Sequence, residues 1–567
     1  MDRIKLVYST EHQDEVELPF RILVLGDFNP NRDPALVAEE EIIDLNRHNF
    51  DRILEHLQVS LHLQVPDYMS DIDDIWDLDI VFRSLHDFTP DALLDSIPHF
   101  RQWLDLVDHL KRLKADEKSE LEVPGAGDRQ LLFSMGFDES DLERGQPDLI
   151  IAEIQHRMGL QLDAVLSHQA FESLEASWRG LFYLVDHLDP AENCSVEIFS
   201  ISKDNLLRDV EDSAELFDSL LYKKVYSEEL GQFGGKPFGV ILADYAFNSR
   251  NPDIRLLSYC ARLAEACQAP FISAADASFF GLEDYAHLSS LRQVSELLNT
   301  SGRYIKWRSF RQKSESRFVG LTLPKIVLRQ PYHYLRERIG HIPYFRSSRA
   351  LFGNSVFGFG VCLLKSFVTY RWCIDIAGKQ GGQVPGMIWE KDLDPDGFRF
   401  SIPTETAISE SMETDLVEAG FIPLKLYKGD QLAVFESANS VKHLAYRNSR
   451  NKELELNEYL SIQLPYTFMM CRLSHYIKVI QRDQIGSSKT TQQLEKELNK
   501  WLIQYVSDMD NPTKAVRTRR PLRKATIRIK EESENQPWYS MELAITPHFK
   551  YLGATFSLSL KGMLESF

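Results

Sequence analysis

Apolar and polar positions repeat with two different periods in the N-terminal part of the chain. Apolar residues at every second position predict half-buried strands at 59–65 and 78–82. A denser apolar run at 18–25 predicts a further strand. Residues 91–114 have helical spacing, and Pro98 is expected to break or kink that helix because proline lacks a backbone donor. Together these elements predict a small α+β unit.

The composition changes at residues 115–147, which are rich in charged and turn-forming residues, as linkers are. Helical spacing begins directly after this segment. Buried strands are predicted at 238–242 and 269–273, and a helical segment separates them. The chain is therefore predicted to divide at this linker into a small domain, residues 1–114, and a larger α/β core, residues 148–567.

The last part of the chain, residues 511–567, alternates again between apolar and polar positions. This alternation predicts strands around 527–529, 541–545 and 556–560. The predicted fold class is mixed, a small α+β domain joined to a larger α/β core that ends in β-strands.

The formal net charge of −20 is distributed unevenly. Residues 1–150 hold about 14 Lys and Arg against 34 Asp and Glu, while the rest of the chain balances at 50 against 50. An acidic lobe does not favour nucleic acid or an anionic membrane, because both require positive charge on the protein. We expect neither nucleic-acid binding nor membrane insertion.

Motifs that carry chemistry do not emerge from the sequence. The segment 486–490 lacks the glycines of a phosphate-binding loop, and the acidic run 71–79 lacks the glycine and glutamate of a calcium loop. The six cysteines include no C-x-x-C pair, which disfavours a zinc site and fits a reducing cytoplasm. We expect no catalytic residue, no cofactor and no metal, and no apolar stretch reaches the length of a membrane span.

Short segments in two parts of the chain carry a family resemblance. In the first part they are Val16–Pro19, Leu23–Phe28, Val59–Leu61 and Phe82–Asp91. In the second part they are Leu174–Leu181, Phe233–Gly239, Asp244–Tyr245, Lys306–Arg311, Gly320–Pro324, Pro403–Glu405, Gly420–Leu424 and His475–Val479. The first set resembles the small sheath subunit of the type VI secretion system, the TssB or VipA family, and the second resembles the large subunit, the TssC or VipB family. The chain is thus similar to a natural or engineered fusion of both.

This resemblance implies a structural role rather than an enzymatic one. The chain would be a subunit of a contractile helical sheath in the bacterial cytoplasm, which polymerises around an Hcp tube on a baseplate and contracts to propel tube and spike outward. It also implies strand exchange between protomers through the chain ends, with Ile4, Leu6, Phe556 and Leu558 as candidate residues. The alternative is that these strands only complete their own sheet.

The resemblance also places a helix against the tube. Residues 491–506 carry one apolar stripe and leave Lys496, Glu497 and Lys500 on the opposite side, which would face the tube. The alternative is a solvated helix on the outer wall.

A basic run between Lys514 and Lys530 contains no acidic residue. Arg519, Arg520 and Arg523 in this run are candidates for pairing with an acidic lobe of a neighbouring protomer. A solvated strand face is the alternative interpretation.

One departure from the family concerns recycling. Separate large subunits present an N-terminal helical peptide to the unfoldase ClpV, but here this end follows the linker, so recycling by ClpV is not expected. A soluble α/β enzyme with an unrecognised site and a non-contractile, sheath-like scaffold remain as alternative functions.

Overall fold

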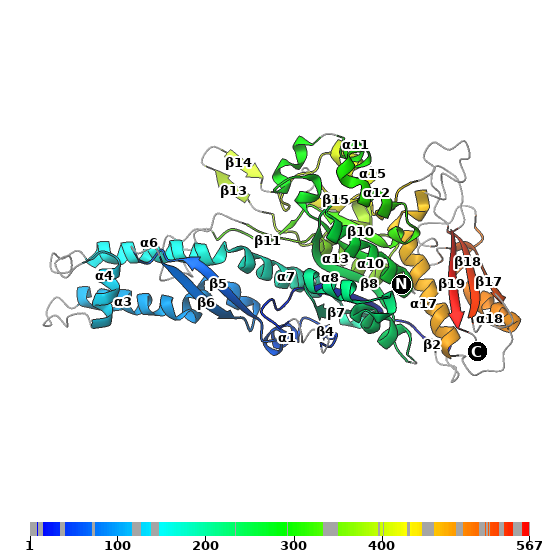
Figure 1. The fold of residues 1–567 in the computed structure, drawn as a ribbon, viewed down its shortest axis with the longest axis horizontal. Helices are drawn as coiled ribbons and strands as arrows, with labels where there is room; N and C mark the ends of the chain where they lie inside the picture. Colours follow the sequence, from blue (N-terminus) through cyan, green and yellow to red (C-terminus); the bar gives the residue numbers. More distant parts are fainter. Residues whose placement is uncertain are drawn as a thin grey trace.

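The molecule is elongated in the computed structural model, with an arm at one end, a central body, and a C-terminal unit at the other end (Figure 1). The described residues are 8–9, 15–33, 40–70, 74–115, 126–137, 147–232, 234–291, 293–332, 350–389, 391–394, 397–400, 402–427, 431–444, 459–483, 491–509, 516, 520, 522–531, 538–547 and 558–565.

The body is built on an eight-stranded mixed sheet in the order β16-β15-β10-β9-β8-β3-β7-β4. Its six central strands run parallel, and the edge strands β4 and β16 run antiparallel to their neighbours. The strands are β3 (Phe20–Gly26), β4 (Ile43–Leu45), β7 (Cys194–Ser200), β8 (Phe238–Phe247), β9 (Phe271–Ala275), β10 (Val319–Leu323), β15 (Ile422–Tyr427) and β16 (Leu432–Phe435). The strands predicted at 18–25, 238–242 and 269–273 are confirmed.

Helices cover both faces of this sheet, and β3 shows why its sequence is a continuous apolar run. Ile22 and Val24 pack into the core on one face, with α7 (Gln169–Asp186) and α13 (Val356–Tyr370). Leu23 and Leu25 pack into the core on the opposite face, with α10 (Asn251–Cys267). All seven residues of β3 are therefore buried, as parallel strands between two helical layers require.

Strand β3 links the predicted small α+β unit to the second part of the chain. β3 lies between β7 and β8 and pairs with both, although these strands come from the second part of the chain. The apolar run at 18–25 predicted a buried strand, but hydrophobicity alone does not say which sheet a strand joins. The N-terminal part thus completes the core of the C-terminal part.

The arm contains most of the remaining N-terminal residues. Its antiparallel hairpin, β5 (Ser60–Pro66) and β6 (Ile75–Val81), packs with α2 (Pro90–Ser96), α3 (Pro98–Ala115) and α6 (Pro147–Leu166). Both predicted strands are confirmed. The predicted helix is interrupted as expected, because α2 ends at Ser96 and α3 begins at Pro98. The predicted linker lies between α3 and α6, and its described part includes a further helix, α4 (Ala126–Ser134).

The C-terminal unit combines a three-stranded antiparallel sheet with two helices. Its strands are β17 (Leu522–Glu531), β18 (Trp538–Pro547) and β19 (Leu558–Glu565), in the order β17-β18-β19. Helices α17 (Leu464–Asp483) and α18 (Thr491–Ile503) share a core with this sheet. The predicted C-terminal strands are confirmed.

Shorter elements complete the described fold. The other helices are α1 (Phe50–His56), α8 (Lys203–Asp212), α9 (Leu220–Tyr222), α11 (Val294–Thr300), α12 (Ile305–Arg311), α14 (Gly378–Gly381), α15 (Glu410–Glu418), the π-helix η5 (Lys223–Leu230) and the 3-10 helices η2 (Leu85–Phe88), η3 (Pro190–Glu192), η4 (Leu216–Asp218), η6 (Ala277–Phe280), η7 (Tyr285–Ser290), η8 (Gly302–Tyr304) and η9 (Ser314–Phe318). The other strands form three pairs, β1 (Tyr8–Ser9) with β2 (Glu15–Val16), β11 (Ile326–Arg329) with β12 (Leu351–Gly353), and β13 (Lys391–Asp394) with β14 (Gly397–Phe400).

Candidate assembly surfaces

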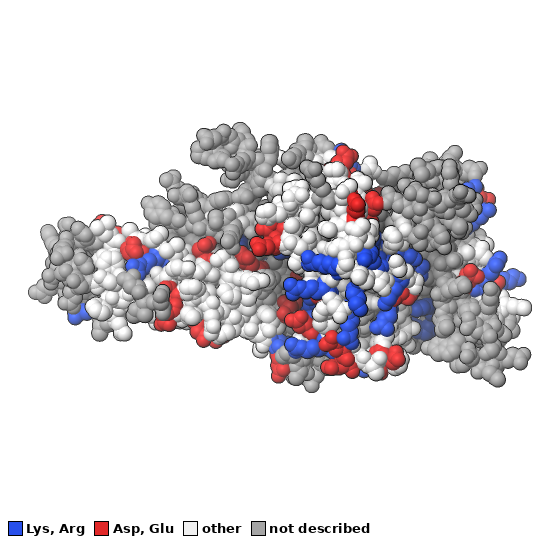
Figure 2. Space-filling view, turned by 45° about the horizontal axis from the view of Figure 1, so that its top comes forward, with Lys and Arg blue, Asp and Glu red and all other residues white. Residues whose placement is uncertain are grey.

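Charge is unevenly spread over the molecule. On the side that Figure 2 shows, Lys and Arg side chains gather on the central body, whereas the described surface of the arm shows few of them. Among the described residues, no three His, Cys, Asp or Glu side chains lie close enough to hold a metal ion. The described part of the chain also contains no helix long and apolar enough to cross a membrane. The features that stand out are ion pairs inside the body and open surfaces on the arm and on the C-terminal unit.

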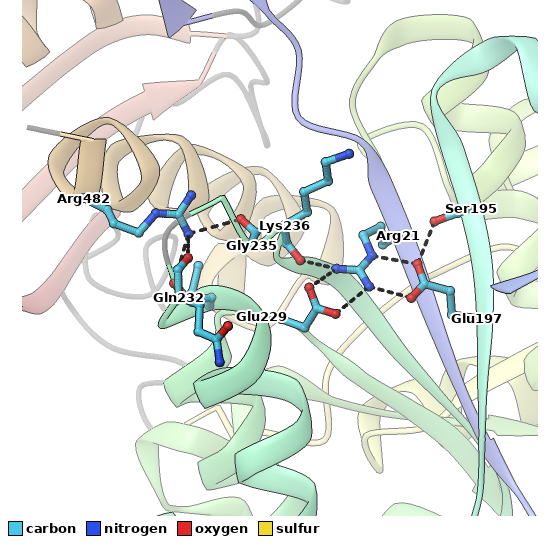
Figure 3. A network of polar contacts seen from close by, with 9 residues as sticks. Arg21, Ser195, Glu197, Glu229, Gln232, Gly235, Lys236 and Arg482 are labelled. Carbon is cyan, nitrogen blue, oxygen red and sulfur yellow. Dashed lines mark hydrogen bonds and ion pairs between the residues drawn. The ribbon is translucent and has the colours of Figure 1, made fainter. Parts of the chain in front are cut away.

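A buried arginine on β3 ties the two parts of the chain together (Figure 3). Arg21 Nε donates to Glu197 Oε1 on β7 at 2.6 Å, and Arg21 Nη2 donates to Glu197 Oε2 at 2.5 Å. The same guanidinium donates to Glu229 of η5 at 2.5 and 2.9 Å and to the Lys236 carbonyl oxygen. The Phe238 ring lies 4.1 Å from the guanidinium carbon. We call Arg21, Glu197 and Glu229 the arginine clasp.

The electrostatics of the clasp favour a permanently charged arginine. Burial alone lowers the pKa of Arg21, but its hydrogen bonds to Glu197 and Glu229 outweigh that effect and raise the pKa above its ordinary value. Arg21 is only 9% exposed, so its attraction to both carboxylates is weakly screened.

A second arginine holds the same region from the C-terminal side. Arg482 on α17 donates to the carbonyl oxygens of Gln232 at 2.6 Å and Gly235 at 3.1 Å (Figure 3). Helix α17 also holds the chain just before β3, because Leu18 N donates to the Tyr476 hydroxyl at 2.8 Å and Arg472 donates to the Leu18 carbonyl oxygen at 3.0 Å. Segments from the beginning, middle and end of the chain are thus fixed together.

Helix α18 has the two-sided character that its sequence predicts. Leu494, Leu498 and Leu502 are buried, while Lys496, Glu497 and Lys500 are exposed. A shallow groove of about 790 Å³ runs beside the exposed side, lined by Thr491, Gln492, Glu495, Lys496, Asn499, Lys500, Ile503 and Ile529. The predicted tube-facing residues therefore lie together on an open surface.

The same helix blocks one edge of the C-terminal sheet. Asn499 Nδ2 donates to the Ile527 carbonyl oxygen at 2.8 Å, and Ile527 N donates back to Asn499 Oδ1 at 2.9 Å. Ile529 N donates to Glu495 Oε2 at 2.8 Å. Backbone groups of edge strand β17 are therefore already satisfied by side chains of α18. The other edge strand of this sheet is β19, whose strand partner in the described part of the chain is β18.

The remaining candidate residues from the sequence have different outcomes. Leu558 begins β19, opposite Ile545 of β18. Arg520 is exposed, and Arg523 is half-buried near the start of β17. Ile4, Leu6, Phe556 and Arg519 lie outside the described residues.

Sequence reasoning missed the arginine clasp. The available signal was a charged residue among mostly apolar neighbours, both at Arg21 and at Glu197. Such residues are rarely buried without partners, so each one indicates a partner elsewhere in the chain. The sequence does not identify that partner, because the two residues are 176 positions apart.

Family models match most of the chain. Residues 1–123 match the model described as type VI secretion system VipA. Residues 148–442 match VipB, the EvpB tail sheath N-terminal domain, and residues 453–564 match the EvpB tail sheath gpW/gp25-like domain.

Two relatives in Pseudomonas aeruginosa strain PAO1 match the two parts separately. The type VI secretion system sheath protein TssC1 is 34% identical over 428 residues, which cover 74% of this chain and 85% of that protein. The sheath protein TssB1 is 27% identical over 116 residues, 20% of this chain and 67% of that protein. A cryo-EM structure of an anti-feeding prophage baseplate covers 69% of this chain and 77% of its own, at 8% identity and a TM-score of 0.32, a likeness too weak to argue from.

Proposed function

We propose a function from one premise: the chain belongs to the type VI secretion sheath family and joins its VipA-type small subunit and VipB-type large subunit in one polypeptide. It is a structural subunit of a contractile sheath and not an enzyme. Proteins of this kind form a polymeric sheath.

The observation that carries the proposal is the shared sheet of the body. Because β3 from the VipA-type part lies between β7 and β8 of the VipB-type part, one chain supplies a complete sheath protomer. We propose that residues 1–114 and 148–567 derive from the two subunits, with 115–147 as their junction. Fusion then fixes their ratio at one to one.

The inner tube and the baseplate are the proposed partners of this sheath. Helix α18 is a suitable contact for an Hcp tube, because its apolar side is anchored in the C-terminal unit and its charged side is open. Single exposed ion pairs are weak, but a ring of many protomers adds them together. We place the assembly in the bacterial cytoplasm, with no role for ClpV at the fused junction.

Strand exchange between protomers is the proposed link along the sheath. Since α18 side chains satisfy part of β17, the β19 edge is the better place for a strand from a neighbour. Residues near Ile4 and Leu6 would donate that strand. Leu558 is the first residue of the accepting strand β19, and Phe556 precedes it in the sequence. At about 1 kcal/mol net per hydrogen bond, roughly four to six bonds stabilise such a link by several kcal/mol. Arg519, Arg520 and Arg523 would add charge pairs with an acidic neighbour.

Electron microscopy of the purified chain, with and without Hcp, tests the proposal. A contractile sheath forms hollow tubules in a long and a short state. Tubules of one fixed length would indicate a non-contractile scaffold instead. Discrete particles under every condition would contradict the proposed function.

A further inference from the structure

The arm carries an open, acidic sheet surface. In the β5–β6 hairpin one side packs into the core through Leu61, Leu63, Val65, Trp76, Leu78 and Ile80. The other side is exposed, and on β6 it presents Ile75, Asp77, Asp79 and Val81 in a row. Because alternate residues of a strand share a side, this row spans about 20 Å. We call these four residues with Asp74 the acidic face.

Both the charges and the apolar residues of the acidic face are open to contact. Ile75 is 62% and Val81 is 53% exposed, so both apolar side chains can be covered by a partner. Between them, Asp77 and Asp79 each lie 3.0 Å from a ring nitrogen of His62 on β5. One imidazole between two carboxylates leaves net negative charge on this surface.

The body carries a surface of opposite charge. From η8 to η9 the sequence 303–317 contains six basic residues and one acidic residue. Arg311 is buried, and the other five are exposed or half-buried. With Arg262 of α10 they form the basic face, which comprises Arg262, Arg303, Lys306, Arg308, Lys313 and Arg317.

Contacts between the two segments make the basic face continuous. Lys313 Nζ donates to Ser258 Oγ of α10 at 3.0 Å, and Arg317 lies 4.0 Å from Glu265 of the same helix. Arg262 falls on the side of α10 between these two contacts, because positions four and seven apart share a helix face. Ile305, at 59% exposed, lies within this surface. The basic face therefore resembles the acidic face in layout, with charges around an exposed apolar side chain.

The two faces belong to different parts of the molecule, the arm and the body (Figure 1). We propose that the acidic face of one protomer docks on the basic face of a second copy of this chain. Contact between two different surfaces of identical chains gives a ring when the rotation between copies closes and an open helical polymer when it does not, and a sheath requires the second. This inference rests on the proposed function, since it supplies a specific lattice contact for the sheath.

Charge reversal on each face tests the pairing. The first variant is Asp77→Lys with Asp79→Lys, and the second is Arg262→Glu with Lys306→Glu. In either variant taken alone, the reversed face meets a face of the same charge on the next copy. We therefore expect tubule mass in a pelleting assay to fall at least about tenfold near physiological salt. Matched controls are Asp51→Lys with Glu55→Lys and Arg52→Glu with Arg208→Glu, which make the same charge changes at exposed positions outside both faces.

Mixing the two variants provides the decisive measurement. In the mixture, every reversed face meets a face of opposite charge, so assembly is expected to return. Sedimentation velocity of the mixture is expected to show complexes that neither variant forms alone, and this readout does not depend on tubules. If the mixed variants associate but the wild-type chain forms no tubules, the inference stands and the proposed function fails.

Three results would overturn the docking. The first is normal assembly by either variant, and the second is loss of assembly without recovery on mixing. The third is a short DNA duplex that binds tightly near physiological salt to the wild-type chain but not to the second variant. The basic face would then be a site for nucleic-acid phosphates.

Discussion

At the scale of single residues, several buried charges in the described part of the chain join distant segments. Arg21 pairs with Glu197 across 176 positions, and Arg329 pairs with Glu175 across 154 positions. A buried pair is weak evidence for stability by itself, but removal of one partner leaves an uncompensated charge in the interior. These ion pairs therefore contribute chiefly to the specificity with which distant segments of the chain pack together.

Replacement of Arg21 tests this view. Arg21→Met leaves Glu197 and Glu229 without their shared counter-ion, so we expect a loss of about 3–5 kcal/mol in the free energy of unfolding. Urea denaturation of the free protomer measures it. The triple variant Arg21→Met, Glu197→Gln, Glu229→Gln removes the charges together and is expected to recover at least half of that loss. Equal stability of wild type and Arg21→Met would contradict the argument.

His475 gives a second residue-scale prediction, on pH. Its Nε2 lies 2.9 Å from the Cys267 carbonyl oxygen, and burial lowers its pKa to about 3. Below about pH 6.5 the unfolded chain binds a proton that the folded chain does not, so stability falls as the pH decreases toward 3. Between pH 7.5 and 5.5 this single group costs about 1.4 kcal/mol.

The comparison variant for this pH effect is His475→Gln, which keeps a side-chain donor but does not titrate. Urea midpoints at both pH values are expected to fall more for the wild type than for the variant. The same pH dependence in both proteins would mean that other groups, not His475, dominate.

At the scale of elements, the sequence predicted what each segment forms better than where it lies. Strands β5, β6 and β8 and the break at Pro98 follow from periodicity and proline chemistry, which are local. The place of β3 in the central sheet and the edge of β17 covered by Asn499 depend on contacts between distant positions. Periodicity carries no information about such partners, so neither could be predicted from it.

Helix α18 tests the proposed tube contact. The double variant Lys496→Glu with Lys500→Glu is expected to reduce co-assembly with Hcp tubes several-fold. Each protomer then presents negative instead of positive charge, so a ring of weak attractions becomes a ring of weak repulsions. Melting temperature should stay within about 2 °C, because both side chains are exposed. Lys111→Glu with Arg112→Glu on α3 is the matched control. Sheaths filled with tube at wild-type yield would remove α18 from the lumen.

The N-terminal strand tests the proposed exchange. Deletion of residues 1–9 removes β1 and the residues before it but leaves β3 and its partners intact. We expect tubules to disappear from electron micrographs while a cooperative melt remains near that of the full chain. Normal tubules from the truncated chain would contradict strand donation by this end.

At the scale of the whole molecule, we expect the two parts of the chain to stay together without the proposed junction once they have folded. β3 pairs on both sides and contributes to the cores on both faces of the sheet, and the arginine clasp fixes it further. Covalent linkage matters most while the parts find each other, because it turns their meeting into an intramolecular step.

Cleavage of the folded chain tests this separation of roles. A protease site placed between residues 116 and 125 should be cut without separating the fragments, which are expected to elute together in gel filtration and to part only in denaturant. Denaturing electrophoresis verifies the cut. Fragments that separate under native conditions would show that the shared sheet alone does not hold the protomer.

The place of β3 in the sheet also means that this strand is synthesised long before the strands with which it pairs. Glu197, the partner of Arg21, is added 176 residues later, which takes roughly 9 to 35 s at about 5–20 residues per second. During that interval the seven residues of β3, all of them buried in the folded protein, have left the ribosome before the strands and helices that will cover them. An exposed apolar strand is prone to associate with other chains, so we expect slower translation to lower the share of the protein that reaches its folded form.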